Sequence, residues 1–245
     1  MTKAIEIMNF LDNRYPKNLR AEWDVVDAHI EGDENKEVHK IGVGLELSKE
    51  FLDKNFDMII LHHPPKFGKD KVVTNPFYNK LNNKPVIYVL HSRIDVKGDL
   101  NISLASGLFK YFNVEKVLDD GTVIICLSNE IELPELIDII KIKLNKKTIK
   151  LIRKKNKISR IAIHGGEGFN KHHVEKAVNE GIDVYLAGDL THHLAESADF
   201  HDVTFIDIEH VSEKMGMKDL CSILRTKFSD CDFEYINREP YWETL

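Results

Sequence analysis

The sequence predicts an α/β protein with two pseudo-repeated lobes, in which helices flank mixed sheets. The chain has 245 residues, enough for two lobes of ordinary size, and short apolar strands alternate with helical patterns along it. In addition, residues 40–64 have a counterpart at residues 160–193, with the same order of strand, helix, strand and histidine pair. We therefore expect a first lobe over residues 1–117 and a second over residues 118–245, whose C-terminal part returns to the site described below.

The first lobe opens with an apolar stripe at helical spacing over residues 2–13, which a Tyr-Pro step ends. Residues 40–47 alternate as a strand, and Ser48 then stands where a helix N-cap belongs. Two more strands are expected at residues 58–61 and 85–90.

The second lobe repeats the first-lobe pattern. Asp57 and Asp183 open the second strand of their copies at matching places. The other elements of this half are expected to be a linker and strand at 114–127, a helix at 133–144, strands at 149–152 and 203–208, and a helix at 214–228.

Composition excludes several classes of function. The formal charge is −6 and no basic run is interleaved with aromatic residues, so we do not expect nucleic-acid binding. No stretch of about 18 apolar residues predicts a membrane span, and the N-terminus does not read as a targeting segment, so we expect a cytoplasmic protein. The three cysteines form no C-x-x-C pair, which favours reduced thiols and a metal site built from nitrogen and oxygen.

The strongest local signal is His62-His63-Pro64-Pro65, which follows the strand at residues 58–61. Ligands sit beyond the carboxyl ends of parallel strands, and a Pro-Pro step stiffens the backbone that presents the two imidazoles. A lone histidine pair is as often without function. Two other strand ends carry the same residue types, however.

After the strand at 85–90, the sequence continues as His91-Ser-Arg-Ile-Asp95, and after the strand at 203–208 it continues through His210 to Glu213. Histidine and carboxylate delivered by neighbouring strand ends can assemble a metal site. Each feature also has a structural interpretation. Asp95 could cap a turn, His91 could be a hydrogen-bonded core histidine, and Glu213 could simply be favoured in the first turn of a helix capped by Ser212. Three such strand ends together favour the metal site.

Taken in order, these motifs resemble the Nif-three-like dinuclear-metal-centre proteins, also known as GTP cyclohydrolase type-two homologues. The resemblance covers nearly the whole chain. In the first half, the family's His-His-Pro is similar to residues 62–64, and its His-Thr-Asn-Leu-Asp is similar to residues 91–95. In the second half, its Gly-rich turn is similar to residues 165–168, and its Thr-Gly-Glu-x-x-His-His is similar to residues 187–193. Its closing His and Glu are similar to His210 and Glu213.

The sequence departs from the family pattern at two places. The last His and Glu of the family are four residues apart, whereas His210 and Glu213 are three apart, and a match without gaps would put Glu209 at the family's His. Of the family's early Trp-Asp-Asn-Val-Gly-Leu, this sequence keeps only Trp23-Asp24 and continues as Val-Val-Asp-Ala.

We therefore expect His62, His63, Asp95, His210 and Glu213 to bind two divalent metal ions. A site of this kind suits Zn²⁺, Fe²⁺, Mn²⁺ or Co²⁺ without distinguishing them. A metal-dependent hydrolase is the first hypothesis, with His91 and His192 as candidate general acid or base. The resemblance implies a purine nucleotide as the small-molecule substrate and a homohexamer as the assembly. The alternative is a metal carrier or regulatory scaffold without turnover.

For the remaining histidine and glycine motifs, a structural role is favoured over a functional one. We expect His172 and His173 to face solvent near a helix start. The run Gly165-Gly166-Glu167-Gly168 could cradle a phosphate, but a tight turn is favoured because no Lys-Ser/Thr step comes after it.

Overall fold

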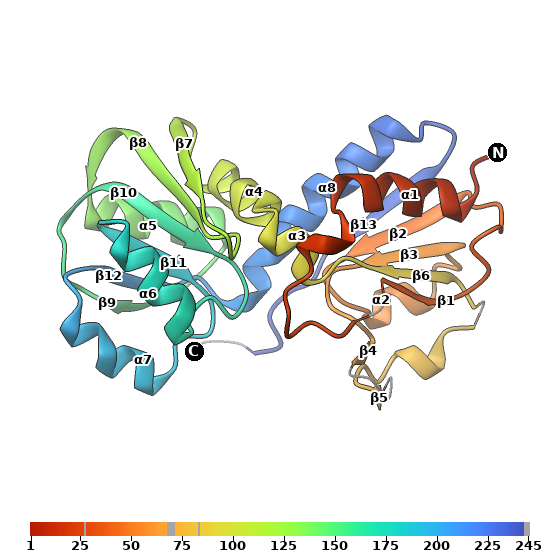
Figure 1. The fold of residues 1–245 in the computed structure, drawn as a ribbon, viewed down its shortest axis with the longest axis horizontal. Helices are drawn as coiled ribbons and strands as arrows, with labels where there is room; N and C mark the ends of the chain where they lie inside the picture. The colour runs from red at the N-terminus through yellow and green to blue at the C-terminus, as the bar shows by residue number, and fades with distance from the viewer. Residues whose placement is uncertain (27, 68–71, 83, 243–245) are drawn as a thin grey trace. The chain divides into compact units, whose positions relative to one another are not determined.

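The computed structural model describes residues 1–26, 28–67, 72–82 and 84–242, which divide into two compact units. Unit 1 comprises Met1–Lys97 and Met217–Glu239, and unit 2 comprises Gly98–Gly216 with the residues from Pro240 onward. Each unit holds a mixed sheet with helices around it (Figure 1). The predicted α/β class with mixed sheets is confirmed.

The chain passes from unit 1 to unit 2 between Lys97 and Gly98, whereas the sequence suggests residues 117 and 118. The next helix, α4 (Asp99–Leu108), buries its apolar face in the core of unit 2. The strand after it, β7 (Phe112–Val117), pairs with the next strand of the same unit. Residues 98–117 therefore pack with the second half of the chain.

Unit 1 is built on a five-stranded sheet in the order β1-β6-β3-β2-β13. Its four strands from β6 to β13 run parallel, and β1 is antiparallel at the edge. β4 (Lys66–Phe67) and β5 (Val72–Val73) pair separately. The bounds of the sheet strands are β1 His29–Glu31, β2 Lys40–Gly44, β3 Met58–Leu61, β6 Val86–Val89 and β13 Asp232–Ile236.

The helices of unit 1 cover this sheet. The predicted N-terminal helix is α1 (Ala4–Arg14), which buries Ile7 and Leu11. β3 and β6 are buried along their whole length, as expected of parallel strands covered on both faces. The other helical segments are α2 Lys49–Leu52, α3 Ser92–Val96, the part of α8 (Lys214–Lys227) from Met217 on, and 3-10 turns at Lys17–Leu19 and Tyr78–Lys80.

Unit 2 is built on a six-stranded sheet in the order β7-β8-β10-β11-β12-β9. Its central strands β10, β11 and β12 run parallel, and the outer ones are antiparallel to their neighbours. The bounds of its other strands are β8 Val123–Glu132, β9 Lys150–Ile152, β10 Lys157–His164, β11 Val184–Ala187 and β12 Thr204–Asp207.

Helices cover both faces of the second sheet. Along β10, Ile161 and Ile163 enter the core beneath α4 and α5, while Ala162 enters the core beneath α6, because side chains alternate along a strand. No helix among the described residues combines the length and apolarity needed to cross a membrane. The remaining helical segments are α5 Leu133–Lys143, α6 Lys171–Asn179, α7 His192–Ser197, and 3-10 turns at Ala198–Phe200 and His210–Glu213.

The repeat predicted from the sequence is present in both units. β2, α2 and β3 form one parallel βαβ unit, and β10, α6 and β11 form the other. The next parallel strand also corresponds, since β6 lies beside β3 and β12 beside β11. Two residues after these third strands the backbone takes a positive φ, 39° at His91 and 62° at Glu209. Candidate site residues thus come after matching strand ends in the two units.

Candidate metal centre

In unit 1, three of the expected ligands lie together at the carboxyl ends of β3 and β6. His62 is almost fully buried, and its Nε2 is 3.6 Å from Oδ1 of Asp95. The backbone N–H of His63 donates to the carbonyl of Leu45, and its ring centroid is 4.6 Å from that of His62. Two imidazoles and a carboxylate therefore converge within one unit.

A further carboxylate in this group escaped the sequence interpretation. Oε2 of Glu46 lies 3.7 Å from Nδ1 of His63, and its Oε1 accepts from Nε of Arg238 at 3.0 Å. Glu46 comes after β2, so it is one more acidic residue beyond a parallel strand. That position was the available signal.

His91, the first candidate acid or base, also belongs to this group. Its ring centroid is 5.8 Å from that of His62, and its Nδ1 is 3.0 Å from Oδ2 of Asp24. Burial raises the pKa of Asp24, but His91 and the hydrogen bonds from Ser92 and the Val26 N–H outweigh it and lower that pKa to about 2. The Asp24 carboxylate is thus ionised and orients the His91 imidazole.

The Trp-Asp pair that survives from the family pattern packs against the same histidine. Trp23 is largely exposed, and its ring lies edge-on to that of His91 at 5.4 Å between centroids. Asp24 holds the other side of the ring through Nδ1. Trp23 and Asp24 therefore both contact the candidate acid or base.

In unit 2, the remaining two expected ligands are neighbours. His210 and Glu213 lie in the 3-10 turn after β12, with Nε2 of His210 3.3 Å from Oε2 of Glu213. Nδ1 of His210 is 2.6 Å from Oδ2 of Asp189, which comes after β11. Burial lowers the pKa of His210, but the two carboxylates prevail and raise it to about 11. The two carboxylates therefore favour the protonated form of this imidazole.

The repeat helps to compare Glu209 and His210, the two residues that could take the place of the family's last histidine ligand. Glu209 occupies the positive-φ position that His91 holds in unit 1, and Glu213 comes after it at the same four-residue interval as Asp95 after His91. The Glu209 carboxylate lies 2.6 Å from the largely buried Nζ of Lys146. Glu209 thus has a cationic partner within the chain, whereas His210 faces Glu213 directly.

The glycine run after β10 is a tight turn, as the sequence favours. The N–H of Gly165 donates to Oδ1 of Asn101 at 2.7 Å, and Gly166 has a φ of 64°. A Cβ on Gly166 would lie 2.1 Å from Oε1 of Glu213, and one on Gly188 would lie 2.4 Å from the Gly166 carbonyl. Gly166 therefore leaves room for the Glu213 carboxylate, and Gly188 leaves room for the Gly166 carbonyl.

His192, the second candidate acid or base, is exposed at the first residue of α7 in unit 2. Its ring lies 5.9 Å from that of His193. His91 and His192 therefore belong to different units.

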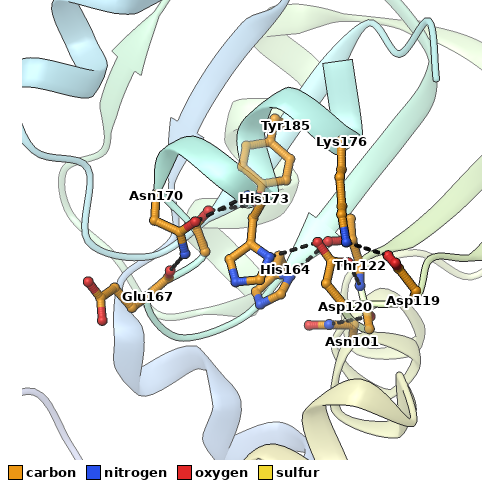
Figure 2. Close-up of polar contacts among 12 residues, drawn as sticks. Asn101, Asp119, Asp120, Thr122, His164, Glu167, Asn170, His173, Lys176 and Tyr185 are labelled. Carbon is orange, nitrogen blue, oxygen red and sulfur yellow. Dashed lines mark hydrogen bonds and ion pairs between the residues drawn. The ribbon is translucent and has the colours of Figure 1, made fainter. Parts of the chain in front are cut away.

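A second group of candidate ligands in unit 2 was missed. Asp120, His164 and His173 each offer a ligand atom within 4.8 Å of the others (Figure 2). The expectation that His173 faces solvent is wrong, since it is half-buried against Asp120, while His172 is exposed. Asp120 stands in an Asp-Gly turn and His164 at a strand end, so neither has a spacing motif that would have identified it.

Comparison with known proteins places the chain among relatives of the same length. Residues 2–240 match the family model described as Duf34/NIF3 (NGG1p interacting factor 3). A Methanocaldococcus jannaschii protein named GTP cyclohydrolase 1 type 2 homolog is 29% identical, over 96% of this chain and 98% of the relative. A protein of the same name from Clostridium perfringens is 27% identical, over 96% of this chain and 95% of the relative.

Solved structures agree in fold along the whole chain. The crystal structure of a hypothetical protein from Staphylococcus aureus has a TM-score of 0.84 and 26% identity, and covers 99% of both chains. Reduced HcgD from Methanocaldococcus jannaschii has a TM-score of 0.80 and 27% identity, over 97% of this chain and 98% of the other. A Bacillus cereus protein related to NIF3 has a TM-score of 0.87 at 18% identity, and the match covers 100% of this chain and 99% of the other. This likeness shows a shared fold.

Proposed function

The chain belongs to the Duf34/NIF3 family, and from this premise we propose that it binds two divalent metal ions and acts as a metal-dependent hydrolase. The observation that carries the proposal is the approach of His62 and Asp95 to 3.6 Å, since they come from two neighbouring strand ends and His62 is buried. An imidazole and a carboxylate so placed are typical of a nitrogen-and-oxygen metal site.

The proposed ligands are divided between the units, with three in unit 1 and two in unit 2. We propose that both sets serve the same pair of ions. The repeat supports this, because Asp95 and Glu213 occupy equivalent places after equivalent strands. The ligands of the proposed centre are His62, His63, Asp95, His210 and Glu213.

When bound, such ions polarise the bond to be attacked and lower the pKa of water. The chain's own contribution to proton transfer would come from His91. Its Nδ1 faces the ionised carboxylate of Asp24, which fixes the ring and leaves Nε2 to accept or donate a proton. His192 is the second candidate for this role, although its exposure supports the role less well.

For the substrate we propose a purine nucleotide, because the relatives carry the name GTP cyclohydrolase 1 type 2 homolog. This step rests on likeness in fold and family rather than on site geometry. We further propose a homohexamer working in the cytoplasm, which the family resemblance and the reduced cysteines favour.

The second candidate is a metal carrier or regulatory scaffold without turnover. The position of His210 favours it, because an imidazole between two carboxylates can hold a proton in place of a metal ion and so couple metal uptake to proton release. A carrier can use such coupling to exchange its ion.

Metal analysis of purified variants tests the binding step. We expect this centre to hold about two divalent ions per chain in the wild type, and the His62→Ala, His63→Ala double variant to lose them. The matched control is His39→Ala with His172→Ala, which removes two exposed imidazoles and should keep the metal. Equal metal content in both double variants would refute the ligand assignment.

Turnover is tested separately with metal-loaded protein, GTP and simple phosphoesters. A product that needs the metal and disappears in His91→Gln, while metal content is kept, supports the hydrolase. Full metal occupancy with no metal-dependent product from any of these compounds would favour the carrier.

A further inference from the structure

A cluster of metal-ligating side chains lies within unit 2, outside the ligand set proposed above. Asp120 comes from the turn between β7 and β8, His164 ends β10, and His173 lies in the first turn of α6. Figure 2 shows the two imidazole rings lying one over the other, with Asp120 and Thr122 on one side of the pair. The ring centroids are 4.1 Å apart and the planes are inclined by 32°. One ligand atom of each of the three residues lies within 4.8 Å of the other two.

Each member of the cluster is held in place by a hydrogen bond of its own. Oδ1 of Asp120 accepts from the N–H of Thr122 at 2.9 Å, so that Oδ2 is left to face Nδ1 of His173 at 2.7 Å. Nδ1 of His164 is 2.8 Å from Oγ1 of Thr122. The side chain of Asn170 caps α6 by accepting from the N–H of His173. Metal-binding histidines are typically oriented by a partner on the nitrogen that does not bind the ion, and Thr122 takes that place at His164.

These contacts use Nδ1 of each ring, and Nε2 of each ring remains. In the part of the chain that the structure describes, neither Nε2 of His164 nor Nε2 of His173 has a hydrogen-bond partner. His164 is only 7% exposed, so solvent has little access to it. A hydrogen-bonded core network accounts for the Nδ1 contacts but leaves this pair of nitrogens without a role.

The charges of the cluster suit a cation. Oδ2 of Asp120 lies 2.7 Å from Nδ1 of His173. The nearby ammonium of Lys176 pairs with Asp119 instead, and no lysine or arginine among the described residues pairs with Asp120. A largely buried carboxylate thus lies beside two imidazoles.

We propose that Asp120, His164 and His173 bind one divalent cation of the zinc class, at a site in unit 2 that shares no ligand with the set proposed above. Two nitrogens and one oxygen suit Zn²⁺, Co²⁺ or Ni²⁺ better than Mg²⁺ or Ca²⁺, which prefer oxygen alone. Ligands at 2.0–2.2 Å from a tetrahedral ion are about 3.4 Å apart, so binding draws the three groups inward. The half-buried side chain of His173, on the first turn of a helix, makes that shift. Water completes the coordination.

Cobalt titration of the full chain tests the proposal, because Co²⁺ in a nitrogen-and-oxygen site gives a visible absorption band. The background is the His62→Ala, His63→Ala double variant, which weakens the centre proposed from the family. We expect this background to bind one Co²⁺ per chain, and Zn²⁺ to displace it with loss of the band. Adding His173→Gln should weaken Co²⁺ binding by about 100-fold or more.

The matched control is His172→Gln, which removes the neighbouring exposed imidazole on the same helix and should leave Co²⁺ binding unchanged. Asp120→Asn keeps the shape of the third ligand and should weaken binding as well. Circular dichroism shows whether each variant is folded, and His173→Gln, on a half-buried side chain, is the variant expected to fold best.

Two results would overturn the second site: a background that binds no Co²⁺, or equal Co²⁺ binding in the His173→Gln and His172→Gln proteins. Neither affects the centre proposed above, which is judged by the metal that His62→Ala, His63→Ala removes from the wild type. If the wild type binds only the ion that His173→Gln removes, the second site is supported and the centre proposed above is refuted.

Discussion

Asp57 and Asp183 make the same hydrogen bonds in the two units. Oδ2 of Asp57 accepts the backbone N–H groups of His39 and Lys40, each at 3.0 Å. Oδ2 of Asp183 accepts those of Ser159 and Arg160, also at 3.0 Å. In each unit the carboxylate thus ties the start of the second strand of the βαβ unit to the start of the first.

Replacing either aspartate should therefore destabilise the protein. We expect Asp57→Ala and Asp183→Ala each to lower the free energy of unfolding by about 1–3 kcal/mol, because two backbone N–H groups lose a charged acceptor. The measurement is urea denaturation of the metal-free protein. Asp53→Ala, at an exposed position after α2, is the control and should change the free energy by no more than about 0.5 kcal/mol. Losses no larger than this in both variants would contradict the prediction.

The repeat was visible in the sequence because it depends on local patterns. Alternating and continuous apolar runs predict the strands, and strand ends predict where His62 and Asp95 meet. The ligand cluster of Asp120, His164 and His173 was not visible, because its members are brought together by pairing between distant strands and each is ordinary in its own segment. An aspartate before glycine reads as a turn residue, and it is one as well as a partner of His173.

The position of the division between units was also beyond local patterns. Residues 98–117 could pack with either half, and the choice depends on which core accepts the apolar face of α4. The pairing of Glu209 with Lys146 depends likewise on a contact between a strand end and the residues after α5. Charge and burial at such places depend on the assembled unit rather than on spacing in the sequence.

Acid should weaken the protein through Asp24. The pKa of this carboxyl is about 2 in the folded protein and about 3.9 in an unfolded chain. Because the folded state binds the proton less tightly, the stabilisation is complete above about pH 4 and is lost as the pH falls towards about 2. The difference corresponds to about 2–3 kcal/mol.

Asp24→Asn removes this titration. The variant should be less stable than the wild type by about 2–3 kcal/mol at neutral pH, and the gap should narrow as the pH falls below about 4. Denaturant unfolding at a series of pH values, with a chelator present, measures the stability difference at neutral pH and its change with pH. A gap that stays constant down to the lowest pH would show that Asp24 is not the group responsible.

The ion pair of Lys146 and Glu209 should show energetic coupling. The Lys146 side chain is 8% exposed and that of Glu209 is 23% exposed, with 2.6 Å between Nζ and Oε2. Removing one partner leaves a poorly solvated charge, so Lys146→Met and Glu209→Gln should each cost about 1–3 kcal/mol. The double variant should cost less than the sum by about 1 kcal/mol or more. A double-mutant cycle by urea denaturation measures this coupling, and additivity within about 0.5 kcal/mol would argue against it.

Gly166 should be needed for the position of Glu213 as well as for its own backbone conformation. Gly166 and Gly181 have φ values of 64° and 71°, so alanine at either position carries a backbone strain of about 1–2 kcal/mol. A Cβ on Gly166 would lie 2.1 Å from Oε1 of the buried Glu213, whereas a Cβ on Gly181 would lie 3.6 Å from its nearest neighbour, an ordinary contact. The two variants thus share the strain and differ in the clash.

Gly166→Ala should consequently lower the affinity for the divalent metal by about tenfold or more, since Glu213 must turn away from its place beside His210. Gly181→Ala should bind metal as the wild type does, although both variants lose stability. Metal titration followed by calorimetry, with unfolding measured on the same samples, separates the two effects. Equal metal affinity in the two alanine variants would mean that Glu213 either accommodates the methyl group without moving or is not a ligand, and Glu213→Gln measured in the same titration then decides between these explanations.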